Sequence, residues 1–110
     1  MVSEIDAIGG LKAHEMLVLL AICRRLKKAT SMTTGDVESL YAVVCEEYDQ
    51  KMKSHTTLWK YLKELETRQL IKTRISTVDD GRGRTTHLSM PHFLPSDIAS
   101  RLEMLVKKRL

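Results

Sequence analysis

The hydrophobic residues of the first quarter of the chain recur with helical spacing. From residue 11 to about residue 29 they cover a broad arc, which predicts a central helix buried on much of its circumference. The residues before it, 1–10, contain Gly9-Gly10 and are expected to form a lead-in segment. The Thr- and Ser-rich residues 30–35 break the helical pattern, and Thr33-Thr34 is predicted to form a short extended piece.

Two amphipathic helices follow, separated by a short polar connection. The first of them is predicted over residues 36–49, with Asp36 or Thr34 as its N-cap. The second is predicted over residues 55–69 and follows Ser54, a favourable N-cap residue. Two such helices joined by about four residues are typical of a helix-turn-helix. The core stripe of the second helix consists of Leu58, Leu62 and Leu65.

After residue 69 the hydrophobic period changes from about 3.6 residues to about 2. Residues 70–78 alternate, with Ile71 and Ile75 on one face and basic residues on the other, which predicts a strand with one face in water. A glycine-containing loop at 79–84 leads to a second alternating segment at 85–90. Together these segments predict a β-hairpin.

A closing helix completes the predicted architecture. Pro91 and Pro95 bracket a connector, and Ser96 is the expected N-cap of a helix that ends in basic residues. The order is therefore three helices, a hairpin and a final helix, which is the winged helix-turn-helix arrangement. We expect residues 11–110 to form one such domain, mainly α with a small β-hairpin.

The distribution of charge adds to this picture. The 110 residues are 43% hydrophobic and 29% charged, which suits one globular domain and excludes an intrinsically disordered chain. Residues 1–49 hold 5 Lys and Arg against 8 Asp and Glu, whereas residues 50–90 hold 9 against 4. The middle segment is therefore expected to present a basic face that attracts phosphates; a merely solvated surface is the alternative.

Several classes of protein are disfavoured by the sequence. The longest apolar run, residues 16–23, is far shorter than the roughly 20 residues of a membrane-spanning helix, and we expect no signal peptide and no membrane partner. Cys23 and Cys45 lie inside helical patterns, which indicates small core residues in the reducing cytoplasm. The histidines and cysteines lack zinc-ligand spacing and there is no P-loop, so we expect no catalytic residue, metal or cofactor in this chain.

The face of the third helix opposite its core stripe has the composition of a DNA-reading surface. Thr56, Lys60 and Lys63 fall on that face, with Thr57 and Glu64 beside it. Short hydroxyl side chains approach base edges in a major groove while lysines reach phosphates, and free N–H groups at the helix start favour an anion. An ordinary solvated face is the alternative interpretation, and the carboxylate of Glu64 favours it.

The loop of the predicted hairpin adds a second basic element. Gly81 and Gly83 flank Arg82, so the backbone can adopt positive φ and the tip stays narrow. A narrow arginine tip suits a minor groove, where the negative potential of DNA is strong. Asp79 and Asp80 oppose this electrostatically, and a flexible polar tip is the alternative.

Several segments of the chain, in a fixed order, carry a resemblance to a known family. The segments are Leu11-x-x-His14-Glu15-x-Leu17, Thr34-Gly35-Asp36-Val37, Ser54-His55-Thr56-Thr57-Leu58-Trp59-Lys60, Leu70-Ile71 and Gly81-Arg82-Gly83-Arg84-Thr85. They are similar to segments of the C-terminal winged-helix domain of archaeal origin-recognition replication initiators of the cell-division-control type, and the resemblance extends from residue 11 over nearly the whole chain. It implies double-stranded DNA binding at replication origins, with the recognition helix in the major groove and the wing in the minor groove.

The resemblance and the helix face together give the expected DNA contacts. Those on the recognition helix are Ser54, His55, Thr56, Thr57, Lys60 and Lys63. Those on the wing are Arg74, Arg82, Gly83, Arg84 and Thr85. Family members carry an AAA+ ATPase module upstream, so ATP or ADP and magnesium are expected only for that module, which this chain lacks. We expect the chain itself not to be an enzyme, and residues 1–10 to be the link from that module.

Two other functions stay open at this point. The domain could be a protein-interaction module that docks a replicative helicase or another initiator paralogue through its acidic N-terminal half and its closing helix. It could instead be a winged-helix transcription regulator, which would form a symmetric dimer on a palindromic site. The sequence contains no heptad seam for such a dimer. We expect the protein in the cytoplasm, associated with the nucleoid.

Overall fold

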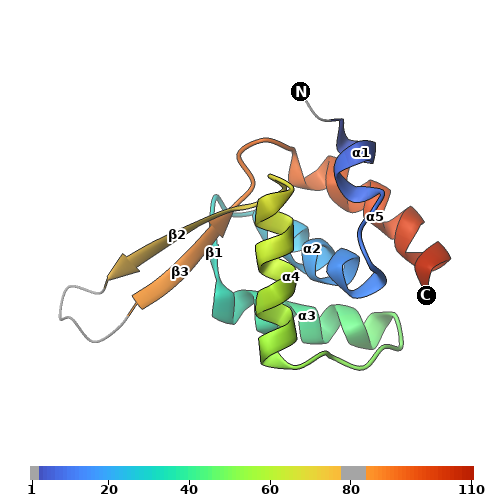
Figure 1. Ribbon diagram of the computed structural model, residues 1–110, viewed down its shortest axis with the longest axis horizontal. Helices are drawn as coiled ribbons and strands as arrows, with labels where there is room; N and C mark the ends of the chain where they lie inside the picture. The colour runs from blue at the N-terminus through green and yellow to red at the C-terminus, as the bar shows by residue number, and fades with distance from the viewer. Residues whose placement is uncertain (1–2, 78–83) are drawn as a thin grey trace.

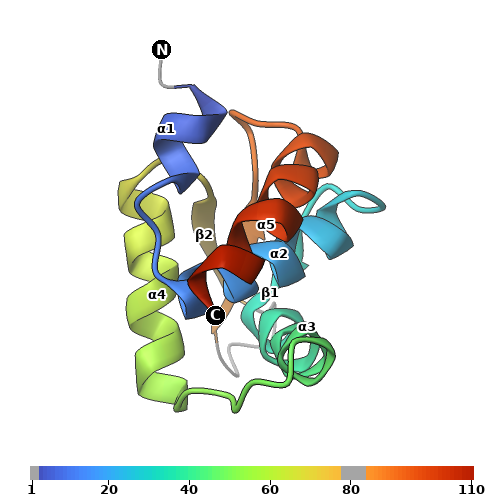
Figure 2. The ribbon, with the colours of Figure 1, turned by 90° about the vertical axis from the view of Figure 1, so that its right-hand side faces the viewer.

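A computed structural model describes residues 3–77 and 84–110 of the chain. The helices pack around one central helix, and a small sheet projects from one side of this bundle (Figures 1 and 2). The predicted winged helix-turn-helix with an additional C-terminal helix is thereby confirmed. In chain order the elements are α1 (Glu4–Ile8), α2 (Ala13–Leu26), β1 (Met32–Thr33), α3 (Thr34–Glu47), α4 (His55–Thr67), β2 (Lys72–Thr77), β3 (Arg84–Ser89) and α5 (Pro95–Arg109).

The central helix is α2, as the broad arc of its apolar residues predicts. Ten of its residues are buried, and α3, α4 and α5 all pack against it. Its buried residues include one charged side chain, Glu15, which is 5% exposed. The Glu15 carboxylate accepts the backbone N–H of Lys12 at 2.7 Å, so its charge lies at the positive end of the helix dipole.

The N-terminal segment is more structured than a lead-in. Residues Glu4–Ile8 form α1, and Ile8 and Leu11 are fully buried in the core. The guanidinium of Arg68, at the end of α4, lies over Gly10, where an added Cβ would be 3.2 Å from Nη1. These few apolar residues give no periodic signal, because a helix of one turn offers too few positions to repeat.

A buried tyrosine holds the turn between α3 and α4. Tyr41 of α3 is fully buried, and its hydroxyl oxygen accepts the backbone N–H of Lys53 at 3.0 Å. The hydroxyl proton is then available for Nδ1 of His14 on α2, at 2.7 Å. Burial raises the pKa of Tyr41 to about 12, so the hydroxyl keeps its proton at neutral pH. The start of α4 is thereby fixed to the central helix.

Side-chain caps set the first residues of α3 and α4. Ser54 caps α4 as predicted, and its Oγ accepts the N–H of Thr57 at 3.2 Å. The prediction for α3 was wrong, because Thr33, rather than Thr34 or Asp36, is the N-cap. Thr33 and Asp36 form a reciprocal capping box, with the two hydrogen bonds at 3.2 and 3.1 Å, and this satisfies both backbone N–H groups.

The closing helix begins two residues earlier than predicted. Leu94 is the N-cap of α5 and Pro95 takes its first helical position, so Ser96 lies inside the helix. A proline is tolerated there because the first N–H groups of a helix have no intrahelical acceptor. Ile98 and Leu102 are fully buried where α5 packs on α2.

The sheet is antiparallel with strand order β1-β3-β2. Met32 of β1 lies opposite Leu88 of β3, and both side chains are buried. Strand β2 pairs along the whole of β3, and the hairpin extends beyond the helices (Figure 1). The strand face that carries Ile71 and Ile75 was predicted to be buried. It is buried only at the base of the hairpin, at Ile71, whereas Ile75 further along is 61% exposed.

The end of α4 offers a test of backbone strain. Gln69 has φ of 62°, and the N–H of Leu70 donates to the carbonyl of Leu65 at 3.0 Å, which is a Schellman motif. Glycine adopts this φ without the steric cost of a Cβ. We predict that Gln69→Gly raises the free energy of unfolding by about 0.5–1 kcal/mol in urea denaturation. Gln69→Val places a β-branched side chain at the same φ and should lower the free energy of unfolding. A valine variant more stable than the glycine variant would contradict backbone strain at this position.

His14 makes the stability of the fold depend on pH. Burial and the nearby charge of Lys53 lower the pKa of His14 from 6.5, although a hydrogen bond with Gln50 raises it in part. The unfolded chain therefore binds this proton at higher pH than the folded domain does. The contribution of His14 to the free energy of unfolding is fully present above the pKa that His14 has in the unfolded chain. It is lost as the pH falls through the lower pKa that His14 has in the folded domain.

We predict that the free energy of unfolding falls as the pH drops below the ordinary histidine pKa of 6.5, and that His14→Gln reduces this fall. Urea denaturation at several pH values measures it. His92→Gln is the matched control, because His92 is exposed. An equal reduction of the fall in both variants would contradict a specific role of His14.

Candidate nucleic-acid interface

Helix α4 has one buried face and one exposed face, as its spacing predicts. Leu58, Leu62 and Leu65 are at most 3% exposed. The side chains of Thr56, Lys60 and Lys63 are exposed on the opposite side. Figure 2 shows that α4 lies along one edge of the molecule, in keeping with the exposure of these residues.

The hydroxyl groups at the start of α4 have different roles. Oγ of Ser54 and Oγ1 of Thr57 are 3.0 Å apart and hydrogen-bonded, and both belong to the cap of the helix. Thr56 is exposed, and its hydroxyl has no hydrogen-bond partner within the described part of the chain. Among the hydroxyls of Ser54, Thr56 and Thr57, that of Thr56 is therefore the one open to a ligand.

His55 connects α3 to α4. Its Nδ1 contacts a carboxylate oxygen of Glu38 on α3, and its Nε2 accepts the indole N–H of Trp59 at 2.7 Å. The neutral tautomer with a proton on Nδ1 satisfies both contacts at once. His55 thus orients the indole of Trp59, which is 38% exposed. The i, i+4 spacing of His55 and Trp59 is the sequence signal that could have indicated this contact.

Both carboxylates of α4 have partners. Glu64 accepts the Nε–H of Arg68 at 2.8 Å, one helical turn further on. Oε2 of Glu66 accepts the backbone N–H of Thr73 at 3.0 Å and its hydroxyl at 2.6 Å. The negative charge that argued against DNA binding is therefore engaged, and Glu66 joins the end of α4 to the start of the hairpin.

Two lysines missed by the residue-by-residue prediction precede α4. Lys51 and Lys53 lie in the connection before Ser54, and both are exposed. They bring further positive charge to the part of the chain that leads into this helix. The local excess of Lys over Asp and Glu in the sequence is the signal that could have singled them out.

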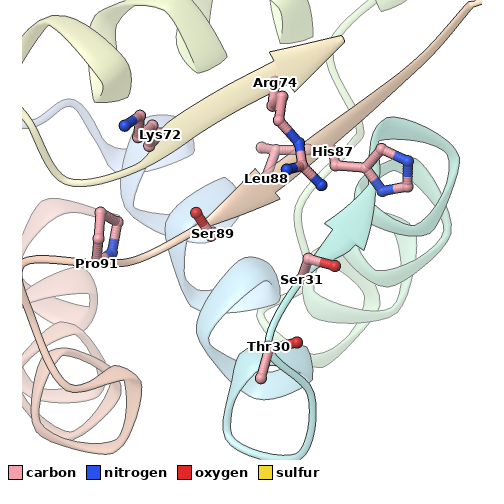
Figure 3. A pocket seen from close by; sticks show the side chains of 8 residues that line it. All are labelled: Thr30, Ser31, Lys72, Arg74, His87, Leu88, Ser89 and Pro91. Carbon is pink, nitrogen blue, oxygen red and sulfur yellow. The ribbon is translucent and has the colours of Figure 1, made fainter. Parts of the chain in front are cut away.

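The predicted wing residues are only partly described. Arg82 and Gly83 lie outside the described residues, and of Arg84 the structure gives only its place at the start of β3. Thr85 is half-buried on β3. Arg74 of β2 is exposed and lies opposite His87 of β3 (Figure 3).

Three other possibilities for the described residues are a metal site, a membrane-spanning helix and a reactive cysteine. Over residues 3–77 and 84–110, no three His, Cys, Asp or Glu side chains form a group that could hold a metal ion. Within the same ranges no helix is both long and apolar enough to span a bilayer. Cys23 and Cys45 are buried free thiols, and burial raises the pKa of Cys23 to about 12, which keeps it from being a nucleophile at neutral pH.

Known proteins with similar sequences are archaeal replication proteins. The chain is 35% identical over 95 residues to ORC1-type DNA replication protein 2 of Saccharolobus solfataricus, a match that covers 84% of this chain and 22% of the relative. It is 29% identical over 108 residues to the protein of that name from Sulfurisphaera tokodaii, over 96% of this chain and 26% of the relative. The chain thus spans about a quarter of the length of these relatives.

A solved structure and a family of known domains are also similar to this chain. The crystal structure of Cdc6p from Pyrobaculum aerophilum superposes with a TM-score of 0.85 at 34% identity, over 99% of this chain and 27% of that one. Residues 6–92 match the family described as the C-terminal winged helix domain of CDC6. With the helices, the hairpin and the sequence all in agreement, the chain belongs to the family of CDC6 C-terminal winged helix domains.

Proposed function

We propose that this domain binds double-stranded DNA at replication origins, with α4 in the major groove and the hairpin directed at the neighbouring minor groove. The exposed face of α4 carries the proposal, because it presents Thr56, Lys60 and Lys63 while both carboxylates of the helix are engaged elsewhere. Two relatives bear the name of DNA replication proteins, which supports the proposed role in initiation.

The geometry suits a duplex. A major groove about 12 Å wide admits one α-helix, and the short side chain of Thr56 allows close approach to base edges. Lys60 and Lys63 reach phosphates from the same face, and the capped N-terminus of α4 adds a favourable dipole. Glu66 bonds to Thr73, so the direction of the hairpin is fixed relative to α4.

The remaining parts of the proposal rest on the sequence. Arg82, Gly83 and Arg84 would supply the minor-groove contacts, with Thr85 at their base. An AAA+ module with ATP or ADP and magnesium would lie outside this chain, as would contacts with a replicative helicase or initiator paralogues. The proposed setting is the cytoplasm, in association with the nucleoid.

The electrostatic part is tested by the salt dependence of binding. If about four to six phosphates are neutralised, log K should fall with log salt at a slope of about −4 to −5. We predict that the double variant Lys60→Ala/Lys63→Ala weakens binding and makes this slope shallower by about 2 in fluorescence anisotropy on an origin duplex.

The matched control is Lys107→Ala/Lys108→Ala, which removes two exposed charges at the end of α5. It should leave the slope nearly unchanged. A wild-type slope near zero, or equal changes in both double variants, would contradict the proposed face.

Two substitutions of Glu66 distinguish the effect of its hydrogen bonds to Thr73 from the effect of its charge. Glu66→Gln removes the negative charge but keeps an oxygen that can accept from Thr73, so we predict unchanged or tighter DNA binding. Glu66→Ala removes the same charge and the hydrogen bonds as well, so we predict binding several-fold weaker than that of Glu66→Gln, as expected for losing about 1 kcal/mol of positioning. Equal affinity of the two variants would show that the link from α4 to the hairpin has no part in binding.

A further inference from the structure

A hollow of about 430 Å³ lies on the outer face of the sheet (Figure 3). It lies between the sheet and the chain that leads into β1. Its wall is partly apolar, from Leu88 and Pro91. The side chains that bring polar chemistry to it are Thr30, Ser31, Lys72, Arg74, His87 and Ser89.

The hollow follows from the shortness of β1. Strand β1 has two residues, which pair with β3 at Leu88 and His87 only. The chain before Met32 is therefore not held beside β3, and Thr30 and Ser31 stand apart from the strands (Figure 3).

The strand register places the cations together on this face. Lys72 and Arg74 are two residues apart on β2, so their side chains point to the same side of the sheet. In the antiparallel pairing Lys72 lies opposite Ser89, and Arg74 lies opposite His87. Paired strands hold these groups at fixed spacing, with side chains of directly opposed residues about 5 Å apart at Cβ.

The positive charge of this face is uncompensated. None of the residues that line the hollow is Asp or Glu. Over the described ranges, neither Lys72 nor Arg74 forms an ion pair with a carboxylate. Like charges held close on one strand face repel one another, and an anion between them would relieve that repulsion.

This face is distinct from the exposed face of α4. Thr73 lies between Lys72 and Arg74 in the strand, so its side chain points to the other side of the sheet. That side chain bonds to Glu66 of α4. The hollow therefore opens on the side of the hairpin away from its contact with α4.

We propose that the hollow is a second anion site, which binds the oxygens of a phosphate group independently of the DNA interface of α4. Arg74 supplies a planar fork of N–H donors, Lys72 a point charge, and the hydroxyls of Ser31 and Ser89 further donors. The phosphate belongs either to a DNA backbone that passes the outer face of the hairpin or to a free phosphate-bearing molecule.

The site is tested with inorganic phosphate on the whole chain, in the absence of DNA. In an NMR titration, phosphate should shift the Arg74 guanidinium and the amides of Ser31 and Ser89 in a saturable way, beyond what sodium chloride of equal ionic strength does. Arg74→Gln should weaken this binding at least about fivefold, as expected for losing one charge-assisted hydrogen bond. Lys108→Gln, an equal loss of charge at an exposed position, should leave it unchanged.

Shifts that follow ionic strength alone, or equal weakening by Arg74→Gln and Lys108→Gln, would overturn the proposal. A second measurement, of duplex affinity, identifies the source of the phosphate. If Arg74→Gln also weakens duplex binding more than Lys108→Gln does, the site holds a DNA phosphate. If duplex affinity stays equal in the two variants while phosphate binding is lost, the site holds a free phosphate-bearing molecule. Either result supports the site, and neither depends on Lys60 or Lys63.

Discussion

The position of α4 depends on one buried hydroxyl group. Tyr41 accepts the N–H of Lys53 just before α4 and contacts His14 on the central helix, so α2, α3 and the turn that leads into α4 meet at a single oxygen. One hydrogen bond contributes only about 1 kcal/mol, but an unsatisfied buried polar group costs more, and this asymmetry makes other arrangements of the turn unfavourable. Every side chain on the outer face of α4 takes its direction from this fixed start.

Pairing of charges, rather than their number, shapes the surface. Within α4 the two lysines and two glutamates cancel in a simple count. The structure engages Glu64 with Arg68 and Glu66 with Thr73, whereas Lys60 and Lys63 stay open to solvent. A helix of zero net charge thus leaves its two lysines open to a ligand, and one of its carboxylates gains a structural role by joining the helix to the hairpin.

The sequence predicts the order of elements and the core stripe of α4 well, because both depend on periodicity within a segment. It predicts less where distant segments meet. Ile75 follows the strand pattern yet is exposed, since the helices end before the hairpin does. The contact of His55 with Glu38 joins two helices, and the hollow beside Arg74 depends on the length of β1, so no local pattern contains either.

Trp59 gives this fold a built-in optical reporter. It is the only tryptophan of the chain, it sits on α4, and its indole is part-exposed and hydrogen-bonded to His55. Indole emission shifts with the polarity and donors around the ring, so the intrinsic fluorescence of the protein comes from one known place. Occupancy of the surface around that helix can thus be followed in the unlabelled protein, without a dye to perturb it.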